Sequence, residues 1–303
     1  MHTDPNWPRA GHWLARQDQS FRLGVLGAPA RMGSITPGRT DLTPQAVREV
    51  LLRFSTYDIE TDLDLRELRV SDLGDVPIAE LSLEDSFTPV REAAGRIFGT
   101  GAEAILIGGD NGISFPGVTA LADHFGGLSR VGLLTLDAHF DLRDTDQGLS
   151  NGNPVRSLLN AGMPGSNIVQ LGILGYANSK AYAEVARSAG ITVVTMDQLR
   201  RQGIESAVNS ALQYLGSQVK AVYFDLDVDV MDRSFAPACP GARPGGLHPW
   251  EIKLAARICG RHKLVKAMDL VEVDASRDLA EATVMSTAAC LLSYAGGMLE
   301  SAG

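Results

Sequence analysis

A buried strand that ends in alternating polar residues constrains this chain more than any other stretch. Residues 131–136, VGLLTL, are largely apolar, which is typical of a strand buried on both faces of a sheet. Asp137, His139 and Asp141 follow at every second position. Because alternate residues of an extended segment point the same way, we expect these three side chains to converge on one spot.

A second stretch later in the chain repeats this design. The apolar run 219–224, VKAVYF, leads into Asp225, Asp227, Asp229 and Asp232. The carboxyl ends of parallel strands meet at one edge of a sheet, so the two groups of acids are predicted to share a site.

Such a concentration of acids needs compensation. Four carboxylates within roughly 5 Å of one another repel by about 3 kcal/mol per pair at an effective dielectric near 20, whereas a whole domain is stable by only about 5–15 kcal/mol. Either the groups protonate, or basic side chains pair with them, or cations lie between them. Only Arg143 adjoins the first group, and no basic residue follows the second until Arg233. Divalent metal ions are therefore the favoured interpretation, and the alternative is that the acids end their strands in solvent.

Predicted strands alternate with predicted helices along the chain. Strands are expected at 21–27, 65–70, 104–107, 131–136, 168–173, 191–195, 219–224 and 264–273, and helices at 43–54, 89–99, 115–125, from 154, from Asn178 to Gly190, 204–215, 249–258 and 280–299. This alternation predicts an α/β fold with an open, mostly parallel sheet of about eight strands. No linker divides residues 1–303, so we expect one domain, with residues 1–20 as a segment on its surface.

Composition narrows the function further. The 303 residues carry a formal net charge of −9 and are 45% hydrophobic, with no basic run, so neither nucleic acid nor a membrane is an expected partner. The first residues contain no apolar segment of the kind found in secretion signals. The three cysteines show no CxxC spacing, which favours free thiols and a cytoplasmic location.

Five motifs occur in a fixed order: GGDN at 108–111, DAHFD at 137–141, SNGNP at 150–154, DVDVMDRSFAP at 227–237 and VEVD at 271–274. Together they resemble the ureohydrolases, the family of arginase, agmatinase and formimidoylglutamase. The resemblance covers about residues 24–273 and implies a three-layer α/β/α domain. It also implies two manganese ions per subunit that activate a bridging hydroxide, and a homo-oligomer, commonly a trimer or hexamer.

The resemblance assigns metal ligands residue by residue. Asp137 and Asp227 would bridge both ions. Asp232 matches the third aspartate of the family motif, which leaves Asp225 outside the ligand set, either as an acid behind the ligands or as a charge at the strand end. The complete implied set is Asn111, Asp137, His139, Asp141, Asp227 and Asp229.

Two acids acquire catalytic roles by the same resemblance. Asp141 could hydrogen-bond the hydroxide and take up its proton after attack. Glu272 occupies the position that pairs with the planar amidine or guanidine group of the substrate, and the alternative is that it is only a charge at the end of a strand.

The chain departs from the arginase and agmatinase pattern at two positions. Asn111 stands where that pattern has a histidine, and its neutral oxygen binds Mn²⁺ more weakly than imidazole does, so the ion nearest Asn111 is expected to be the labile one. Asn151 stands where those enzymes have a proton-shuttling histidine. Both departures favour formimidoylglutamase within the family.

The arginines agree with a substrate that carries two carboxylates, N-formimino-L-glutamate. Arg143 matches the family position that contacts the amino-acid end of the substrate, although an ordinary salt bridge is the alternative. Arg243 lies in the loop beyond the second acidic group, and Arg156 is a third candidate that could face solvent. Cys239 adjoins the same loop and is interpreted as packing.

We therefore expect a binuclear manganese hydrolase that converts N-formimino-L-glutamate to L-glutamate and formamide, with Asn151 and the two arginines Arg143 and Arg243 in the substrate site. One alternative is a hydrolase of guanidino acids that releases urea. Another is a catalytically silent relative that serves as a binding subunit.

Overall fold

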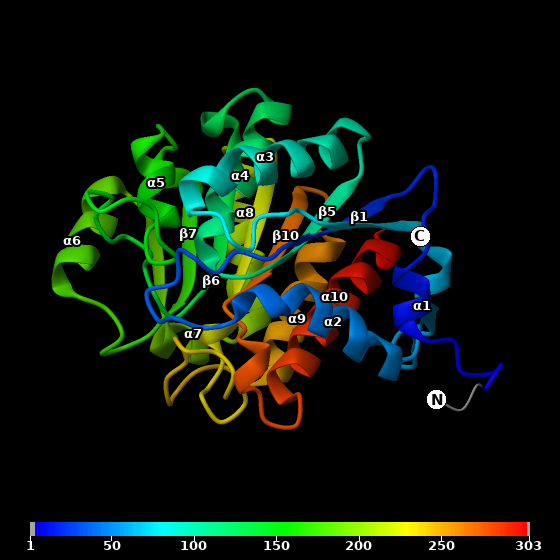
Figure 1. Ribbon diagram of the computed structural model, residues 1–303. Helices are drawn as coiled ribbons and strands as arrows, with labels where there is room; N and C mark the ends of the chain where they lie inside the picture. Colours follow the sequence, from blue (N-terminus) through cyan, green and yellow to red (C-terminus); the bar gives the residue numbers. More distant parts are fainter. Residues whose placement is uncertain (1–3, 302–303) are drawn as a thin grey trace.

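An eight-stranded sheet in which every pairing is parallel forms the centre of the protein (Figure 1). The computed structural model describes residues 4–301. The strand order is β4-β1-β5-β10-β9-β6-β7-β8. The strands are β1 (Leu23–Ala28), β4 (Val70–Asp75), β5 (Glu103–Gly108), β6 (Val131–Leu136), β7 (Ile168–Ile173), β8 (Thr192–Thr195), β9 (Ala221–Asp227) and β10 (Val265–Val271), and a separate antiparallel pair comprises β2 (Tyr57–Asp58) and β3 (Leu63–Asp64).

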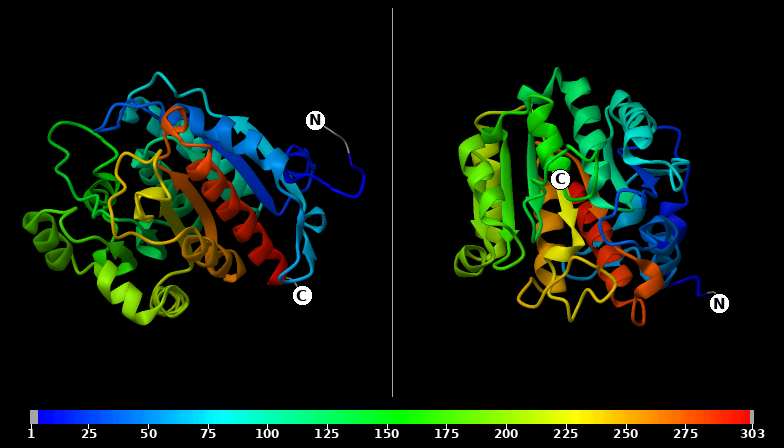
Figure 2. Two further views of the ribbon diagram at one scale, coloured as in Figure 1. Left: turned by 90° about the horizontal axis from the view of Figure 1, so that it is seen from below. Right: turned by 60° about the vertical axis from the view of Figure 1, so that its left-hand side comes forward.

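Helices cover both faces of the sheet and complete three layers (Figure 2). One face carries α3 (Leu83–Gly99), α4 (Ser114–Phe125), α5 (Pro154–Asn160) and α6 (Lys180–Ala189). The other carries α1 (Ala10–Leu14), α2 (Thr43–Val50), α7 (Met196–Gln202), α8 (Ile204–Gly216), α9 (Pro249–Arg261) and α10 (Ala282–Glu300). The predicted α/β fold and its parallel sheet of about eight strands are confirmed.

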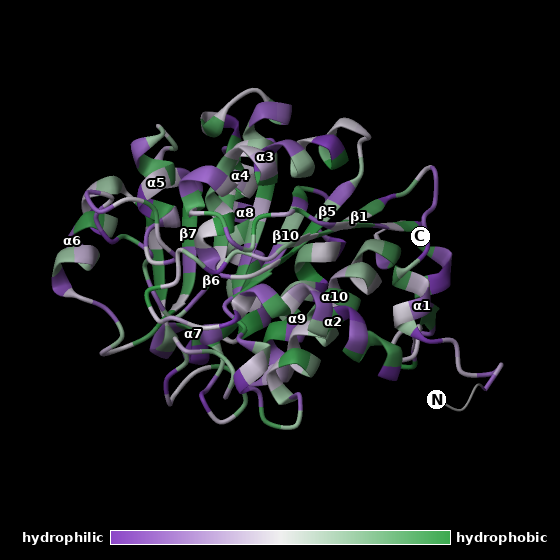
Figure 3. Cartoon of the chain, viewed as in Figure 1, coloured by the Kyte–Doolittle hydropathy of each residue, from purple (hydrophilic) through white to green (hydrophobic). Residues whose placement is uncertain are grey.

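Burial of apolar strands explains why the sheet forms. Every residue of β6, β7 and β9 is buried, and hydrophobic residues concentrate along the strands and the inner faces of the helices (Figure 3). Two hydrophobic clusters, one on each side of the sheet, fill the space between the layers. Each fully buried Leu, Ile or Val side chain in them contributes about 1.5–3 kcal/mol by leaving water.

The two helices α9 and α10 approach each other closely through glycines. A Cβ added to Gly260 would lie 2.1 Å from the carbonyl oxygen of Tyr294, and one added to Gly297 would lie 2.2 Å from that of Arg257. Gly260 therefore lies inside α9 and does not end the helix near Ile258 as predicted. Among the described residues, α10 alone is long and apolar enough to cross a membrane, but 61% of that stretch is buried inside the fold.

Several predicted boundaries were wrong for identifiable reasons. Helix α3 begins at Leu83, not at Pro89, because Ser82 caps it by accepting a hydrogen bond from Asp85 N, and the proline is accommodated inside the helix. Residues 65–67 form a 3₁₀ turn, and the strand begins only at Val70. Helix α7 was not predicted. Thr195 and Gln198 form a capping box there.

The N-terminal segment also differs from its prediction as a surface segment. Helix α1 places Ala10, Trp13 and Leu14 in the hydrophobic core, with side chains at most 2% exposed. The indole nitrogen of Trp13 donates to the carbonyl oxygen of Leu68 at 3.1 Å. This segment therefore contributes a packed helix to the domain rather than only covering it.

Gly109 directly follows β5, and substituting it tests how closely the backbone packs at this edge of the sheet. A Cβ at Gly109 would lie 1.7 Å from the carbonyl oxygen of Ala30, which is a backbone atom. We expect Gly109→Ala to lower the free energy of unfolding in urea by about 2 kcal/mol or more, because backbone must move. Gly95, inside α3, has open space around its Cβ position, so Gly95→Ala should raise stability by about 0.5–1 kcal/mol. Equal effects of the two substitutions would contradict this account.

Candidate metal centre and active site

Four neighbouring strands deliver the predicted ligands to one edge of the sheet. Asn111 follows β5, Glu272 follows β10, Asp227 ends β9 and Asp137 follows β6, and these strands lie side by side in the order β5-β10-β9-β6. The register pairs Leu136 of β6 with Leu226 of β9, so the next residues, Asp137 and Asp227, leave the sheet together. The parallel arrangement thus places residues from distant segments in one crevice.

Asp137, His139 and Asp229 form the tightest cluster. One ligand atom from each lies within 4.8 Å of the others, a spacing that a metal ion could bridge. The imidazole Nδ1 of His139 is 2.7 Å from Asp229 Oδ2 and 3.7 Å from Asp137 Oδ1. Asp137 Oδ2 is buried and has no hydrogen-bond partner in the described chain. A buried carboxylate oxygen without a partner is costly unless a cation approaches it.

Asn111 and Asp141 form the second part of the site. The Nδ2 of Asn111 donates to Asp141 Oδ2 at 2.6 Å, and both residues are buried. Asp141 has a φ of 53°, a left-handed conformation that residues other than glycine rarely adopt. Strained backbone at a polar site is maintained by its surroundings and is typical of functional positions.

The second acidic segment meets the first. Asp227 Oδ1 accepts a hydrogen bond from the backbone nitrogen of Asp229 at 2.8 Å, and Asp229 Oδ1 accepts one from Ala138 N at 3.1 Å. The latter bond joins the two predicted acidic segments directly. Asp225 lies within β9, 1% exposed and beside Asp269, so it is an acid behind the ligands and not a charge at the strand end.

Glu272 is held by two donors on one of its oxygens. Its Oε1 accepts hydrogen bonds from Asn111 N at 2.8 Å and from Asn151 Nδ2 at 2.9 Å. Its φ is 67°, again left-handed. The amide of Asn151 also accepts a hydrogen bond from Ile35 N at 3.0 Å. Asn151 therefore ties Glu272 to the loop that contains Ile35.

A cleft of about 370 Å³ opens above these acids. Its walls include Ile35 and Thr36 of the long loop after β1, and Pro240 and Gly241 of the loop after β9. The predicted site residues that line it are His139, Asp141, Arg143, Asn151, Asp227, Asp229, Arg243 and Glu272. Asp137 and Asn111 contact these residues from beneath.

The three candidate arginines have different surroundings. Arg143 lines the cleft, and its guanidinium forms no hydrogen bond or ion pair with residues 4–301. Arg243 also lines the cleft, but its Nη1 donates to carbonyl oxygens of its own loop, the shortest being that of Gly241 at 2.8 Å. Arg156 instead donates to the carbonyl oxygen of Leu142 and pairs with Asp144 at 3.4 Å, so it supports the loop outside the cleft.

Three supporting residues were missed from the sequence. Asn178, predicted as a helix cap, instead accepts a hydrogen bond from Phe140 N at 3.0 Å and donates to the carbonyl oxygen of Ala138 at 2.9 Å. The cap of α6 is Ser179. Gln170 donates to the carbonyl oxygen of Phe140. A Cβ on Gly241 would lie 2.2 Å from Asp229 Oδ2, and an isolated glycine gives no signal of such proximity.

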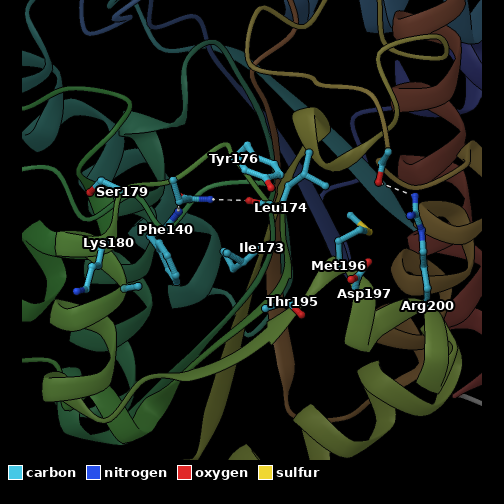
Figure 4. Close-up of a pocket in the computed structure, with 14 residues that line it drawn as sticks. Phe140, Ile173, Leu174, Tyr176, Ser179, Lys180, Thr195, Met196, Asp197 and Arg200 are labelled. Carbon is cyan, nitrogen blue, oxygen red and sulfur yellow. Dashed lines mark hydrogen bonds between the residues drawn. The ribbon is translucent and has the colours of Figure 1, made fainter.

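A second, larger pocket of about 580 Å³ lies beside the cleft (Figure 4). Its lining includes Phe140, Tyr176 and Lys180, and it shares Asn178 and Ser179 with the cleft. The lining carries a single acid, Asp197, and none of the predicted ligands. The chemistry therefore belongs to the smaller cleft.

The buried acids of the site shift one another's pKa values. Burial, reinforced by the charge of Asp229, raises the pKa of Asp137 to about 7. Burial and then the charge of Asp110 raise the pKa of Glu272 to about 8. The negative charge of Asp229 raises the pKa of His139 to about 12, and although burial opposes ionisation of Asp229, the facing imidazolium lowers its pKa.

The two remaining acids of the ligand set follow the same rule. Burial, together with neighbouring carboxylates, raises the pKa values of Asp141 and Asp227 well above the usual range. Without added cations, this cluster therefore retains protons that exposed carboxylates would lose. The unpartnered oxygen of Asp137, the oxygen-rich donor set and the imidazole all fit divalent metal ions of the Mn²⁺ type.

The raised pKa values predict an unusual pH dependence of stability. Between pH 6 and 8 the unfolded chain has lost the protons of Asp137 and Glu272, whereas the folded metal-free protein still holds them at pH 6 and releases them near pH 7 and 8. The folded state binds more protons, so its free energy of unfolding should fall as pH rises, by more than about 1 kcal/mol. His139, protonated only in the folded state over much of this range, acts in the same direction.

Urea unfolding at pH 6, 7 and 8 in EDTA measures this fall directly. Added Mn²⁺ must displace the same protons, so the stabilisation it provides should grow with pH. Equal stability in EDTA at pH 6 and pH 8 would refute the assignment of retained protons.

Comparison with known proteins agrees with this geometry. A model of the arginase family matches residues 21–296. Formimidoylglutamase of Halalkalibacterium halodurans is 35% identical over 289 residues, which are 94% of this chain and 89% of that protein. The crystal structure of formimidoylglutamase from Bacillus subtilis has a TM-score of 0.93 at 28% identity and covers 98% of this chain and 94% of its own.

Formiminoglutamase of Trypanosoma cruzi, whose crystal structure contains Mn²⁺, has the same fold, with a TM-score of 0.89 at 23% identity over 96% of this chain and 98% of its own. The family resemblance predicted from the five motifs and the three-layer architecture are both confirmed. This chain belongs to the arginase family.

Proposed function

We propose that this protein is a manganese-dependent hydrolase that cleaves N-formimino-L-glutamate to L-glutamate and formamide. The name of the H. halodurans relative, and its similarity over nearly the whole of both chains, support this reaction. The observation that carries it is the composition of the cleft, where a cluster of acids faces Arg143, whose guanidinium has no partner among the described residues. Such a cleft suits a substrate with a cationic amidine at one end and carboxylates at the other.

The proposed ligand set can hold two Mn²⁺ ions. Asn111 and Asp141 would contribute to one ion, and His139 and Asp229 to the other, with Asp137 and Asp227 between them. Two bound divalent ions lower the pKa of a water molecule between them, so that hydroxide is available at neutral pH. The presence of Mn²⁺ in the structure of the T. cruzi relative supports the choice of metal.

Glu272 is suited to orient the reacting group. Its Oε1 already accepts hydrogen bonds from Asn111 N and Asn151 Nδ2, whereas its Oε2 takes part in no hydrogen bond with the described residues. This second oxygen can therefore accept hydrogen bonds from the planar, positively charged formimino group. Its fixed position would hold the formimino carbon over the nucleophile.

Arg143 and Arg243 are proposed to bind the carboxylates of the substrate. Both line the cleft, and an arginine binds a carboxylate through paired hydrogen bonds. Agmatine, which carries a positive charge at its far end, would be repelled by the same groups.

The proton of the attacking water is assigned to Asp141. In the reaction the water oxygen adds to the formimino carbon, the bond from that carbon to the glutamate nitrogen breaks, and this nitrogen receives the proton. Asp141 belongs to the proposed ligand set and also lines the cleft, where its left-handed backbone restricts its position, so it can accept and return that proton without moving far.

Two further expectations are retained as proposals, an oligomer that the family resemblance implies and a location that the cysteines favour. We propose that the chain forms a homo-oligomer, a trimer or hexamer, which light scattering would measure. A cytoplasmic location is supported by Cys239, Cys259 and Cys290, which are buried free thiols.

Product analysis tests the reaction itself. With Mn²⁺ at alkaline pH, N-formimino-L-glutamate should release formamide and glutamate, and Asp137→Ala should reduce kcat by at least about a thousandfold because a ligand placed between both ions is lost. A parallel panel of 3-guanidinopropionate, 4-guanidinobutyrate, arginine and agmatine measures urea. Urea from a guanidino acid without formamide from formiminoglutamate would replace the proposal by the guanidino-acid alternative. Absence of all products together with absence of bound Mn²⁺ would favour a silent binding subunit.

Substitution of Arg143 tests the orientation of the substrate. Arg143→Gln should raise KM for N-formimino-L-glutamate about 10–100-fold with a smaller change in kcat, because one charge-assisted pair with a carboxylate is worth about 1.5–3 kcal/mol. Arg187, exposed on α6 and outside the cleft, provides the matched control Arg187→Gln. Equal KM values for the two variants would remove Arg143 from the substrate site.

A further inference from the structure

A row of buried, hydrogen-bonded side chains runs from Asn111 away from the cleft, and its members are Asn111, Ser114, Asp269 and Tyr223. Asn111 Oδ1 is 2.7 Å from the hydroxyl of Ser114, the first residue of α4, and that hydroxyl is 2.6 Å from Asp269 Oδ2 on β10. Tyr223 of β9 donates to the same carboxylate oxygen at 3.0 Å, and Leu226 N donates to Asp269 Oδ1 at 3.3 Å. All four polar side chains are fully buried, so water does not complete their hydrogen bonds.

The hydroxyl proton of Ser114 cannot serve both of its neighbours in this row while the Asn111 amide keeps this orientation. Ser114 has one hydroxyl proton but faces two oxygens, Oδ1 of Asn111 and Oδ2 of Asp269. Asp269 accepts hydrogen bonds on both of its oxygens, from Tyr223 on Oδ2 and from Leu226 N on Oδ1, so with both oxygens acting as acceptors one of these two short contacts would join two acceptors. A buried contact of that kind is repulsive and leaves a polar atom unsatisfied.

Rotating the Asn111 amide by 180° gives each of the two Ser114 contacts one donor and one acceptor. Nδ2 then donates to the oxygen of Ser114, and the hydroxyl of Ser114 donates to Asp269. The carbonyl oxygen of Asn111 now takes the position 2.6 Å from Asp141 Oδ2 that the nitrogen held. Two oxygens at that distance need either a proton or a cation between them.

We infer that Ser114 and Asp269 are positioning residues that turn the carbonyl oxygen of Asn111 toward the metal site. Asn111 is a weak ligand by its chemistry, and only its oxygen binds a cation. The direction of the hydrogen bonds through Ser114 thus determines whether Asn111 acts as a ligand or occupies the site with an NH₂ group. This inference rests on the proposed metal site and assigns a role to two residues outside the ligand set.

The first test measures Mn²⁺ affinity, with no substrate present. Removing the hydroxyl in Ser114→Ala should weaken binding of the more labile ion about tenfold in calorimetric titrations, because residues that orient a ligand typically contribute about 10–100-fold to affinity. Ser86 of α3 is the matched control: it is 1% exposed, and its hydroxyl has no hydrogen-bond partner in the described chain. Ser86→Ala should leave both affinities unchanged.

The second test, Asp269→Asn, reverses the direction of the hydrogen bonds that Ser114 forms. In Asp269→Asn the backbone nitrogen of Leu226 holds the amide oxygen, so the NH₂ group faces Ser114. The hydroxyl must then donate to Asn111 Oδ1, which turns Nδ2 toward the site. We expect the affinity for the labile ion to fall at least as far as in Ser114→Ala, with retained Mn²⁺ per chain after dialysis reduced accordingly.

A double-mutant cycle separates orientation from general damage. Asp at position 111 has two equivalent oxygens and cannot be misoriented, so in an Asn111→Asp background the substitution Ser114→Ala should change Mn²⁺ affinity less than twofold. An undiminished tenfold loss in that background would overturn the positioning role. Unchanged affinity in both Ser114→Ala and Asp269→Asn, with Mn²⁺ bound normally by the parent protein, would also overturn it while leaving the proposed function intact. Failure of the parent protein to bind Mn²⁺ would instead reject both.

Discussion

Repulsion among buried carboxylates at one edge of the sheet is the constraint that the rest of the structure must overcome. Asp137, Asp141, Asp227 and Asp229 are each at most 8% exposed, and burial together with the neighbouring carboxylates raises the pKa values of the first three. His139 is the one basic side chain among them, and it lies 2.7 Å from Asp229 and 3.7 Å from Asp137, so it does not compensate all four acids. The fold must therefore be stable enough elsewhere to hold the remaining acids in place, and the two hydrophobic clusters on either side of the sheet supply that stability.

The strand order brings these acids together in one site. The central strands β5, β10, β9 and β6 come from distant parts of the chain, yet their carboxyl ends lie next to one another. Hydrogen bonds across the ends, such as that from Ala138 N to the carboxylate of Asp229, join the segments. Two of the described non-glycine residues with positive φ, Asp141 and Glu272, lie there. The conformational cost of these residues is thus concentrated where the acids converge.

The sequence allowed the sheet and the acidic cluster to be predicted, because both depend on short periodic patterns. Both patterns involve only residues that are close together in the sequence, namely the apolar run 131–136 and the alternating Asp137, His139 and Asp141. The supporting contacts could not be predicted, because they join residues far apart in the chain. The sequence favours Asn178 as a helix cap, because nothing in it reveals the hydrogen bond from Phe140 N. The sequence favours Gly260 as a helix end, because its contact with Tyr294 exists only where α9 packs against α10.

Asn151 has a consequence for how the entrance of the cleft can move. Its amide oxygen accepts a hydrogen bond from Ile35 N, and its nitrogen donates to Glu272. The loop that contains Ile35 forms part of the rim of the cleft. An outward swing of this rim must therefore either break the first bond or pull on the second. Movement of the rim and the alignment of the Glu272 carboxylate are mechanically linked through Asn151, whose backbone nitrogen also donates to the carbonyl oxygen of Gly33 in the same loop.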